Sequence, residues 1–311
     1  MRRLAVLAST AALLLGALVT APAATAETPP GPEGPARTTF PAALLHSLAH
    51  PGATAPGTND FACRPTDAHP RPVVLVHGTF ENAYDNWAEL APALKADGYC
   101  LFSLNYGGQA GTAFRGLTDI PASARELDTF VDEVLAATGA QKVDVVGHSQ
   151  GGMMPRYYLK NLGGAEHVGR LVGLSPSNHG TTVFGLLTSI VALPGGARAV
   201  GLACEACVQQ TQGSAFNRAL DAGGDTVPGV DYTVIQTKFD EVVTPFSNAF
   251  LDGDRVDNVL LQDVCPLDAT DHLGIAYDPI AIRLVRNALD PSTAQAPSCT
   301  FVPPVISSEP A

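Results

Sequence analysis

The amino-acid sequence predicts an α/β fold with a mostly parallel central sheet and helices on both of its faces. Short apolar runs alternate along the chain with segments whose apolar residues recur at helical spacing, and short loops join them. The apolar runs are continuous, as in strands that are buried on both faces. One run, residues 143–146, breaks into Gly-His-Ser-Gln-Gly before helix-compatible residues, which indicates a sharp turn from a strand into a helix. We therefore expect the functional groups at the carboxyl ends of the strands.

The chain has 311 residues, of which 46% are hydrophobic and 15% are charged. This composition allows one large core, and we find no internal repeat or second domain boundary. We expect a single domain over residues 40–311. Two arginines precede a long apolar run that ends in small residues, so residues 1–26 are predicted to be a secretory signal peptide. Residues 27–39 are rich in proline and glycine and are predicted to be a flexible leader that does not pack.

Predicted export and net charge together limit the partners of the protein. The formal charge is −12, and it becomes −14 when Arg2 and Arg3 leave with the signal peptide. The phosphates of nucleic acids and of anionic membranes would repel so acidic a protein. We therefore expect a secreted, extracellular protein with no nucleic-acid partner, and we expect a monomer.

Six cysteines in an exported chain predict three disulfides, because the environment outside the cell is oxidising. Sequence alone permits many connectivities. Proximity along the chain favours Cys63 with Cys100, Cys204 with Cys207, and Cys265 with Cys299. A redox motif is the alternative for the third and fourth cysteines, but no thioredoxin-like unit surrounds them.

The first half of the domain begins with a strand within residues 71–80. Apolar residues at helical spacing then start at Trp87, and Gly98 closes that helix before a second strand at residues 100–104. Strand and helix therefore alternate from the start of the domain.

The second half continues the alternation. Pro121 opens the next helix and Gly139 ends it, and the strand that leads into the sharp turn follows. Further strands are expected at residues 168–174, 232–237 and 256–261. Asp278 and Pro279 start the last helix.

The Gly-x-Ser-x-Gly pattern makes Ser149 the candidate nucleophile, because such an elbow holds a serine in a strained turn at the end of a buried strand. Gly147 and Gly151 leave room for the close approach of strand and helix. The pattern also occurs by chance in ordinary turns, so the partners of the serine decide. A serine hydroxyl is a poor nucleophile at neutral pH and needs a base, together with an acid that orients the base.

Three histidines follow Ser149, and the chain order serine, acid, histidine of elbow hydrolases selects among them. His167 precedes any acid loop, and His179 directly follows the strand next to the elbow. His272 lies in a loop between the last strand and the last helix, where the fold places its base. We therefore predict His272 as the base.

The acid should end the strand before that loop, and two adjacent carboxylates follow the strand at residues 232–237. We predict Asp240 as the acid. Glu241 could serve instead, and either residue could also be a solvated loop charge. Three later aspartates lie too close to His272 to come from a separate strand end.

The negative charge that develops on a carbonyl oxygen needs preorganised donors. In this fold they are the backbone N–H of the residue after the nucleophile, here Gln150, and one from the loop after an earlier strand, here Thr79. The Thr79 hydroxyl could add a third donor, although this loop could also be a simple turn. His77 and His148 are expected to support the loop and the elbow by hydrogen bonds rather than to act as bases.

With these residues in place, the chain resembles the class 2 family of secreted bacterial triacylglycerol lipases. Four motifs carry the resemblance, in the right order within about residues 60–290: Val-His-Gly-Thr-Phe at 76–80, Gly-His-Ser-Gln-Gly-Gly at 147–152, Lys-Phe-Asp-Glu-Val-Val at 238–243, and Asp-His-Leu-Gly at 271–274. The chain is also similar to the fungal lipase B type in its oxyanion threonine and in the glutamine after the nucleophile. The resemblance implies an α/β-hydrolase fold, esterase or lipase activity and no organic cofactor. No acidic cluster has calcium-loop spacing, so no metal site is predicted.

A long segment, residues 181–225, separates two strands and is far longer than a simple connection. Its first half is rich in apolar residues, so we expect a cap that lies over Ser149 and lines the acyl pocket. The predicted pocket residues are Phe80, Phe184, Leu187 and Ile190. The alternatives for the segment are an ordinary buried helix and an apolar surface that meets a lipid–water interface.

The sequence thus predicts a secreted serine ester hydrolase, most simply a triacylglycerol lipase that works through an acyl-enzyme. A short-chain esterase, a polyester hydrolase and an acyltransferase are alternatives on the same three residues. A lipid-binding protein without activity on the same scaffold is the alternative from another class, since a fold alone does not fix a function.

Overall fold

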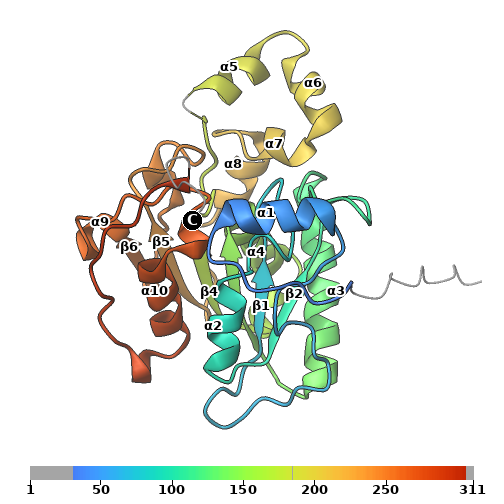
Figure 1. Cartoon of the computed structure of the whole chain (residues 1–311). Coiled ribbons are helices and arrows are strands. Elements are labelled where there is room, and N and C mark those ends of the chain that lie inside the picture. Colours follow the sequence, from blue (N-terminus) through green and yellow to red (C-terminus); the bar gives the residue numbers. More distant parts are fainter. Residues whose placement is uncertain (1–30, 184, 306–311) are drawn as a thin grey trace, which may run out of the picture.

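The structure is a computed structural model of the chain, and it describes residues 31–183 and 185–305. The predicted signal peptide, residues 1–26, and the predicted pocket residue Phe184 lie outside these ranges. The described residues contain one central sheet with helices on both of its faces (Figure 1). The α/β class predicted from the sequence is therefore confirmed.

The sheet has six strands in the order β2-β1-β3-β4-β5-β6, and each neighbouring pair is parallel. The strands are β1 (Val73–Val76), β2 (Leu101–Leu104), β3 (Val143–His148), β4 (Val168–Leu174), β5 (Asp231–Gln236) and β6 (Val256–Leu260). All six lie within or next to the predicted runs. Because the strands are parallel, their carboxyl ends share one edge of the sheet.

Helices connect the strands and cover the sheet. They are α1 (Phe40–Ala49), α2 (Leu90–Ala96), α3 (Ile120–Thr138), α4 (Gln150–Asn161), α5 (Leu186–Ala192), α6 (Gly196–Ala203), α7 (Glu205–Gln209), α8 (Ala215–Asp221), α9 (Leu261–Val264) and α10 (Pro279–Leu289). Short 3-10 helices lie at Gly164–Glu166, Phe246–Ala249, Ile275–Tyr277 and Pro291–Thr293. The helix expected from Trp87 begins at Leu90, because turns occupy the preceding residues, yet Trp87 is fully buried.

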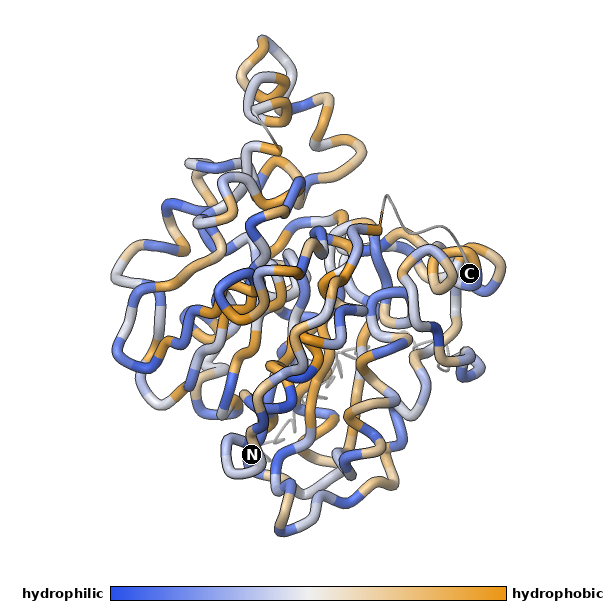
Figure 2. The backbone as a smooth tube through the Cα atoms, turned by 60° about the vertical axis from the view of Figure 1, so that its left-hand side comes forward, coloured by the Kyte–Doolittle hydropathy of each residue, from blue (hydrophilic) through white to orange (hydrophobic). Residues whose placement is uncertain are grey.

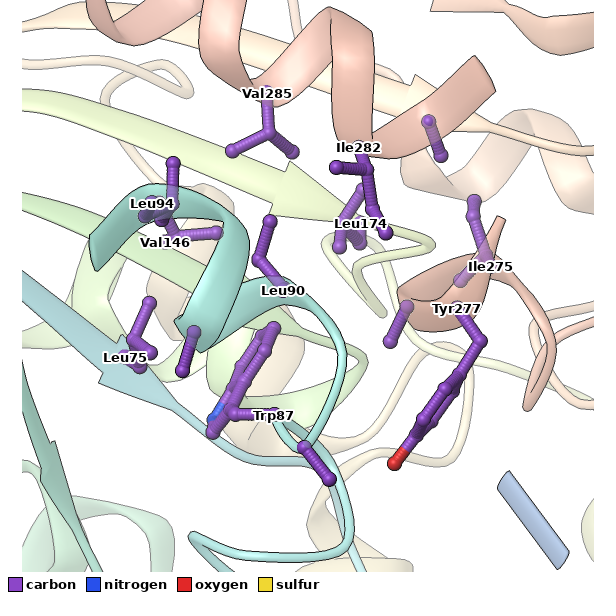
Figure 3. Close-up of a cluster of buried hydrophobic side chains, with 14 of the residues drawn as sticks. Leu75, Trp87, Leu90, Leu94, Val146, Leu174, Ile275, Tyr277, Ile282 and Val285 are labelled. Carbon is purple, nitrogen blue, oxygen red and sulfur yellow. The ribbon is translucent and has the colours of Figure 1, made fainter. Parts of the chain in front are cut away.

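Two hydrophobic clusters hold the helices against the sheet, one on each face. Alternate residues of a strand point to opposite faces, so Val73 and Leu75 of β1 join one cluster and Val74 and Val76 join the other. The first cluster packs α1, α2 and α10 against the strands, and Figure 3 shows its centre around Trp87. The second cluster packs α3 and α4. In Figure 2 orange, apolar stretches of the backbone run through the middle of the molecule, as a sheet with two buried faces requires.

The predicted helix ends have clear local causes. Asp119 accepts a hydrogen bond from the backbone N–H of Ala122 at 2.9 Å, so it caps α3, and Pro121 fits the first turn. Gly139 ends α3 with a left-handed φ of 73°, a conformation that glycine adopts without strain. Asp278 caps α10 in the same way as Asp119 caps α3.

The leader predicted over residues 27–39 was wrong in its described part, because residues 31–39 pack on the domain. The backbone N–H of Gly34 donates to the Thr54 carbonyl at 2.9 Å. The buried Tyr84 hydroxyl donates to the carbonyl of Pro35 at 2.7 Å. Proline and glycine give this segment an extended path that needs few partners, and polar groups of the domain supply them.

All three predicted disulfides are present: Cys63–Cys100, Cys204–Cys207 and Cys265–Cys299. No free cysteine remains among the described residues. The Cys204–Cys207 bridge lies where α6 meets α7, in the segment predicted to be a cap.

The predicted cap, residues 181–225, has two unlike halves. Its helices α5 and α6 project from the body in Figure 1 and contain no buried residue. Its helices α7 and α8 pack on the body through buried Ala206 and Leu220. Within the described ranges no single helix is long and apolar enough to cross a membrane, although α5 and α6 together, bent by 117°, have the necessary length and composition.

Candidate active site

Ser149 occupies the turn between β3 and α4, with φ 54° and ψ −122°. Only glycine permits this turn at the two flanking positions. A Cβ on Gly147 would lie 1.9 Å from the Gly151 carbonyl oxygen, and a Cβ on Gly151 would lie 2.1 Å from that of Val76. Strand and helix therefore approach as closely as the sequence predicted, and Ser149 is held in a backbone conformation that non-glycine residues rarely adopt.

The structure brings Asp240 and His272 together at the same edge of the sheet. Asp240 follows β5, and His272 follows α9. His272 Nδ1 lies 2.9 Å from Asp240 Oδ2, and both side chains are buried. Glu241, the alternative acid, instead accepts a hydrogen bond from the backbone N–H of His272 at 3.2 Å. Asp240 is thus the carboxylate that can fix the tautomer of the imidazole.

The surroundings keep this aspartate ionised. Burial opposes its negative charge, but the nearby His272 and the backbone N–H groups of Val242 and Val243 outweigh that cost and hold the pKa of Asp240 below its ordinary value. For His272, burial acts to lower the pKa, and the charge of Asp240 and its hydrogen bond more than reverse this, so the pKa is raised. An imidazole stabilised in its charged form is suited to accept a proton.

The imidazole ring of His272 packs against that of His148 in the elbow. The two imidazole rings have centroids 4.8 Å apart, and His148 directly precedes Ser149. Among the described residues, the His272 ring pairs with Asp240 through Nδ1, and no hydrogen bond joins it to Ser149. Catalytic hydrogen bonds are often long without substrate and shorten when it binds.

The two predicted oxyanion donors also meet here. Gln150 is the first residue of α4, so its backbone N–H belongs to the first turn and has no acceptor within the helix. The Thr79 hydroxyl donates to Gln150 Oε1 at 2.7 Å. Gly78 lies against the nucleophile, since a Cβ there would be 3.1 Å from Ser149 Cβ. The Thr79 loop and the start of α4 therefore border the nucleophile together.

Sequence analysis missed two polar residues of this site. Glu81 is buried, and its carboxylate lies 2.8 Å from His148 Nδ1, while His148 Nε2 lies 2.9 Å from the backbone carbonyl oxygen of His272. Gln210, from the cap, donates to both Thr79 Oγ1 and Gln150 Oε1 at 2.9 Å. No spacing in the sequence marks either residue, because each acts through contacts with distant segments.

The remaining histidines have structural contacts. His77 Nδ1 lies 2.8 Å from the Gly78 carbonyl oxygen, and its ring stacks on Tyr106. His179 lies 3.1 Å from Asp221 and 3.4 Å from Asp225, and these carboxylates raise the pKa of His179 to about 9. His77 therefore has hydrogen-bond and stacking partners next to the loop that contains Thr79.

His179, Asp221 and Asp225 are close enough together to ligate a metal ion. The buried guanidinium of Arg156, however, pairs with both carboxylates, at 3.3 Å and 3.1 Å. With His179 as a second cation, the two negative charges are already balanced, so the cluster is an ionic network.

The predicted pocket residues that the structure describes lie on two different segments. Phe80 follows Thr79 with a φ of 64°, and half of its side chain is exposed. Leu187 and Ile190 lie on the projecting α5. A cavity of about 520 Å³ lies elsewhere, between α10 and the starts of β5 and β6, so it is at the edge opposite Ser149.

Comparisons with known proteins agree on a family and a fold. The model of the family described as lipase (class 2) matches residues 70–283. Lipase B of Pseudozyma antarctica is 29% identical over 191 residues, which are 60% of this chain and 53% of that protein. A triacylglycerol lipase of Pseudarthrobacter phenanthrenivorans is 37% identical over 91 residues, or 28% of this chain and 27% of that one. The chain thus spans about half the length, or less, of the curated relatives that it matches.

Solved structures give the same result. Lipase B of Aspergillus fumigatus superposes with a TM-score of 0.61 at 25% identity, over 79% of this chain and 57% of that one. The mature lipase BlEst2 of Bacillus licheniformis, at 19% identity and a TM-score of 0.55, shows a common fold over 73% of this chain and 94% of that one. Together with the parallel sheet, these likenesses confirm the predicted α/β-hydrolase fold.

Proposed function

The chain belongs to the class 2 lipase family, and from that premise we propose that it is a secreted serine hydrolase of carboxylic esters, triacylglycerols among them. The observation that carries the proposal is the buried His272–Asp240 pair, with Nδ1 and Oδ2 2.9 Å apart, beside the elbow that holds Ser149. The nucleophile, its base and the acid that orients the base come from three loops at one edge of the sheet.

In the proposed reaction, His272 Nε2 accepts the proton of Ser149 as Oγ attacks the ester carbonyl. Asp240 stabilises the imidazolium that results. The backbone N–H groups of Thr79 and Gln150 donate to the oxyanion of the tetrahedral intermediate. His272 then gives its proton to the departing alcohol, which leaves an acyl-enzyme on Ser149. A water molecule, deprotonated by His272, then attacks the acyl-enzyme, and the carboxylic acid is released.

A fluorophosphonate probe tests this assignment of the nucleophile. We expect a covalent adduct on the peptide that contains Ser149, and loss of both the adduct and the ester turnover in Ser149→Ala. Circular dichroism of the variant shows that it is folded. A folded wild-type protein that neither reacts with the probe nor hydrolyses any ester would overturn the proposal and favour a lipid-binding role.

Exposed leucines of the segment that contains α5 and α6 favour a lipase over a short-chain esterase or a polyester hydrolase. Leu186, Leu193 and Leu202 are exposed by 62%, 62% and 83%. The free energy of apolar side chains that water surrounds falls when they enter a lipid surface. We therefore propose that the monomer works at a lipid–water interface.

The choice of substrate can be measured directly with p-nitrophenyl esters of increasing chain length and with emulsified long-chain triglycerides, using Ser149→Ala as the blank. We expect turnover of the emulsion to rise sharply above the solubility limit of the substrate. Activity on acetate and butyrate esters alone would exclude the lipase and favour the short-chain esterase. For the proposed export, N-terminal sequencing of secreted protein should give a start near Glu27, and an intact Met1 in the medium would contradict it.

A further inference from the structure

The base of the cap places one side chain on both residues of the oxyanion hole. Gln210 follows α7, is buried, and uses its single amide nitrogen to donate to Thr79 Oγ1 and to Gln150 Oε1, each at 2.9 Å. Its amide oxygen accepts from the Ser177 hydroxyl at 2.8 Å. These side chains form a closed polar network next to the nucleophile.

The network has only one consistent orientation. Gln210 Nε2 also lies 3.3 Å from the Ala206 carbonyl oxygen, which can only accept, so this atom must be the nitrogen. Gln150 must then turn its oxygen toward Gln210, because two amide nitrogens would otherwise face each other. This orientation has an energetic cost at the amide nitrogen of Gln150. Gln150 Nε2 is buried without a hydrogen-bond partner among the described residues. Gln210 thus determines which way the Gln150 amide points.

This orientation decides what the Thr79 hydroxyl can do. Its single proton goes to Gln150 Oε1 in the structure, while its oxygen accepts from Gln210. When the proton turns toward a substrate oxyanion, Gln150 Oε1 keeps the hydrogen bond from Gln210 and is not left unpaired. Without Gln210, the same rotation would leave a buried amide oxygen without a donor, which is unfavourable.

We propose that Gln210 is a positioning residue that lets the Thr79 hydroxyl change from Gln150 in the resting enzyme to the oxyanion in the transition state. The proposal rests on the ester hydrolysis proposed above. No covalent bond forms or breaks in this step, because the Thr79 hydroxyl changes direction by rotation about its Cβ–Oγ bond. An interaction that appears only in the transition state raises kcat and leaves KM unchanged.

The backbone of Gln210 is fixed independently of the projecting helices. Its carbonyl accepts from the N–H of Thr181 at 2.8 Å, where the cap leaves the body. The preceding Gln209 accepts from the N–H of Ile120 at 2.7 Å and donates to Asp119 at 2.6 Å, at the start of α3. Movement of α5 and α6 can therefore leave the oxyanion network undisturbed.

A double-mutant cycle tests the proposal on soluble p-nitrophenyl esters. Thr79→Val removes the hydroxyl and nearly keeps the shape of the side chain. It should lower kcat about 100-fold, which is the usual effect of removing one oxyanion donor. Gln210→Met should lower kcat about tenfold with KM within about threefold, because the hydroxyl remains but is misdirected. In the Thr79→Val background, Gln210→Met should change kcat less than about twofold. In a Thr79→Ser background, which keeps a hydroxyl, the tenfold effect should return.

The matched control is Gln212→Met, which removes an exposed amide two residues further along the chain without touching Thr79 or Gln150, and should leave kcat within about twofold. If Gln210→Met proves unstable by thermal unfolding, Ser177→Ala releases the same side chain and should show the same loss of coupling in the Thr79→Val background. Equal effects of Gln210→Met with and without the Thr79 hydroxyl, or an unchanged kcat, would overturn the inference. Because wild-type turnover and Ser149 labelling are measured first, this outcome leaves the proposed hydrolase intact.

Discussion

The two halves of the cap insertion differ in what holds them. Helices α7 and α8 are tied to the body by Gln209, Gln210 and the His179 network. Helices α5 and α6 carry the exposed leucines and bury no residue. Among the described residues of the cap, Gln210 of the polar half donates hydrogen bonds to Thr79 and Gln150, the predicted oxyanion residues.

This difference separates two tasks that one insertion can serve. Polar contacts are directional, so a segment held by them keeps its side chains at fixed distances from the reacting groups. An apolar segment without partners has no preferred position in water, and its free energy falls when it meets an apolar phase. We expect turnover to depend on the anchored half and on the edge of the sheet beneath it, and contact with lipid to depend on the projecting half.

The largest effect should come from the catalytic edge itself. His272→Ala should lower kcat by about 10⁴-fold or more, because the triad acts as one unit. His179→Ala, which removes a cation from the ionic network at the base of the cap, should keep kcat within about threefold and lower the melting temperature by a few degrees. Stopped assays with a soluble ester and thermal unfolding measure the two quantities. The opposite result would show that His179 is the base.

A change at Gly116 should have the next largest effect, because this residue presses on the oxyanion loop. Its φ is 69°, and a Cβ there would lie 3.0 Å from the Gly78 carbonyl oxygen and 3.2 Å from Thr79 Cα. Gly116→Ala should therefore displace the Thr79 N–H and lower kcat about 100-fold. Gly111 in the same loop has a φ of 78° and nothing within 4 Å, so Gly111→Ala carries the same backbone strain without the clash. Similar kcat values for the two variants would contradict the assignment of Thr79.

The projecting half should affect only reactions at an interface. Serine at Leu186, Leu193 and Leu202 should lower the rate on emulsified triglyceride about tenfold and leave kcat/KM for a soluble ester within about twofold. Leu267, exposed by 58% on the loop after α9, provides the matched control with Leu267→Ser. A parallel loss on both substrates would mean that α5 and α6 help to form the site instead.

The sequence predicted the strands, the elbow and the acid–base pair because each has a local signature. A continuous apolar run marks β3, two glycines mark the elbow, and chain order singles out His272. Glu81 and Gln210 have no such signature, because a polar residue between loops looks the same whether water or a buried partner satisfies it. The packed leader was missed for a related reason, since its partners, such as Thr54, lie on other segments.

The pocket stays a prediction. Apolar residues of the cap predicted a lining for the acyl group, but composition does not distinguish a helix that folds over Ser149 from one that points away from it. Leu187 and Ile190 lie on α5, which projects from the body in Figure 1. Whether such a helix packs on the body depends on its tertiary contacts, which the number of apolar residues does not predict.

The smallest effect concerns stability beneath the catalytic edge, at the pair Asp268 and Asp278. Both are buried, and each has one oxygen without a hydrogen-bond partner among the described residues. We expect the two carboxyl groups to share one proton. Burial and the neighbouring carboxylate raise the pKa of Asp278 to about 8, and burial raises that of Asp268. A carboxyl group whose pKa is raised by folding stabilises the fold at pH values below its unfolded pKa, near 4, and this contribution is lost as the pH rises through about 8.

Asp278→Asn should remove this dependence. The asparagine oxygen can still cap α10 at the Ile280 N–H, and its amide can donate to an ionised Asp268 at every pH. Between pH 5 and pH 9, the melting temperature of the wild type should therefore fall further than that of the variant, by roughly 3–5 °C. Other buried carboxyls such as Asp144 titrate in the same range, but they are the same in both proteins and cancel in the difference. Parallel curves over this range would show that the two aspartates do not share a proton.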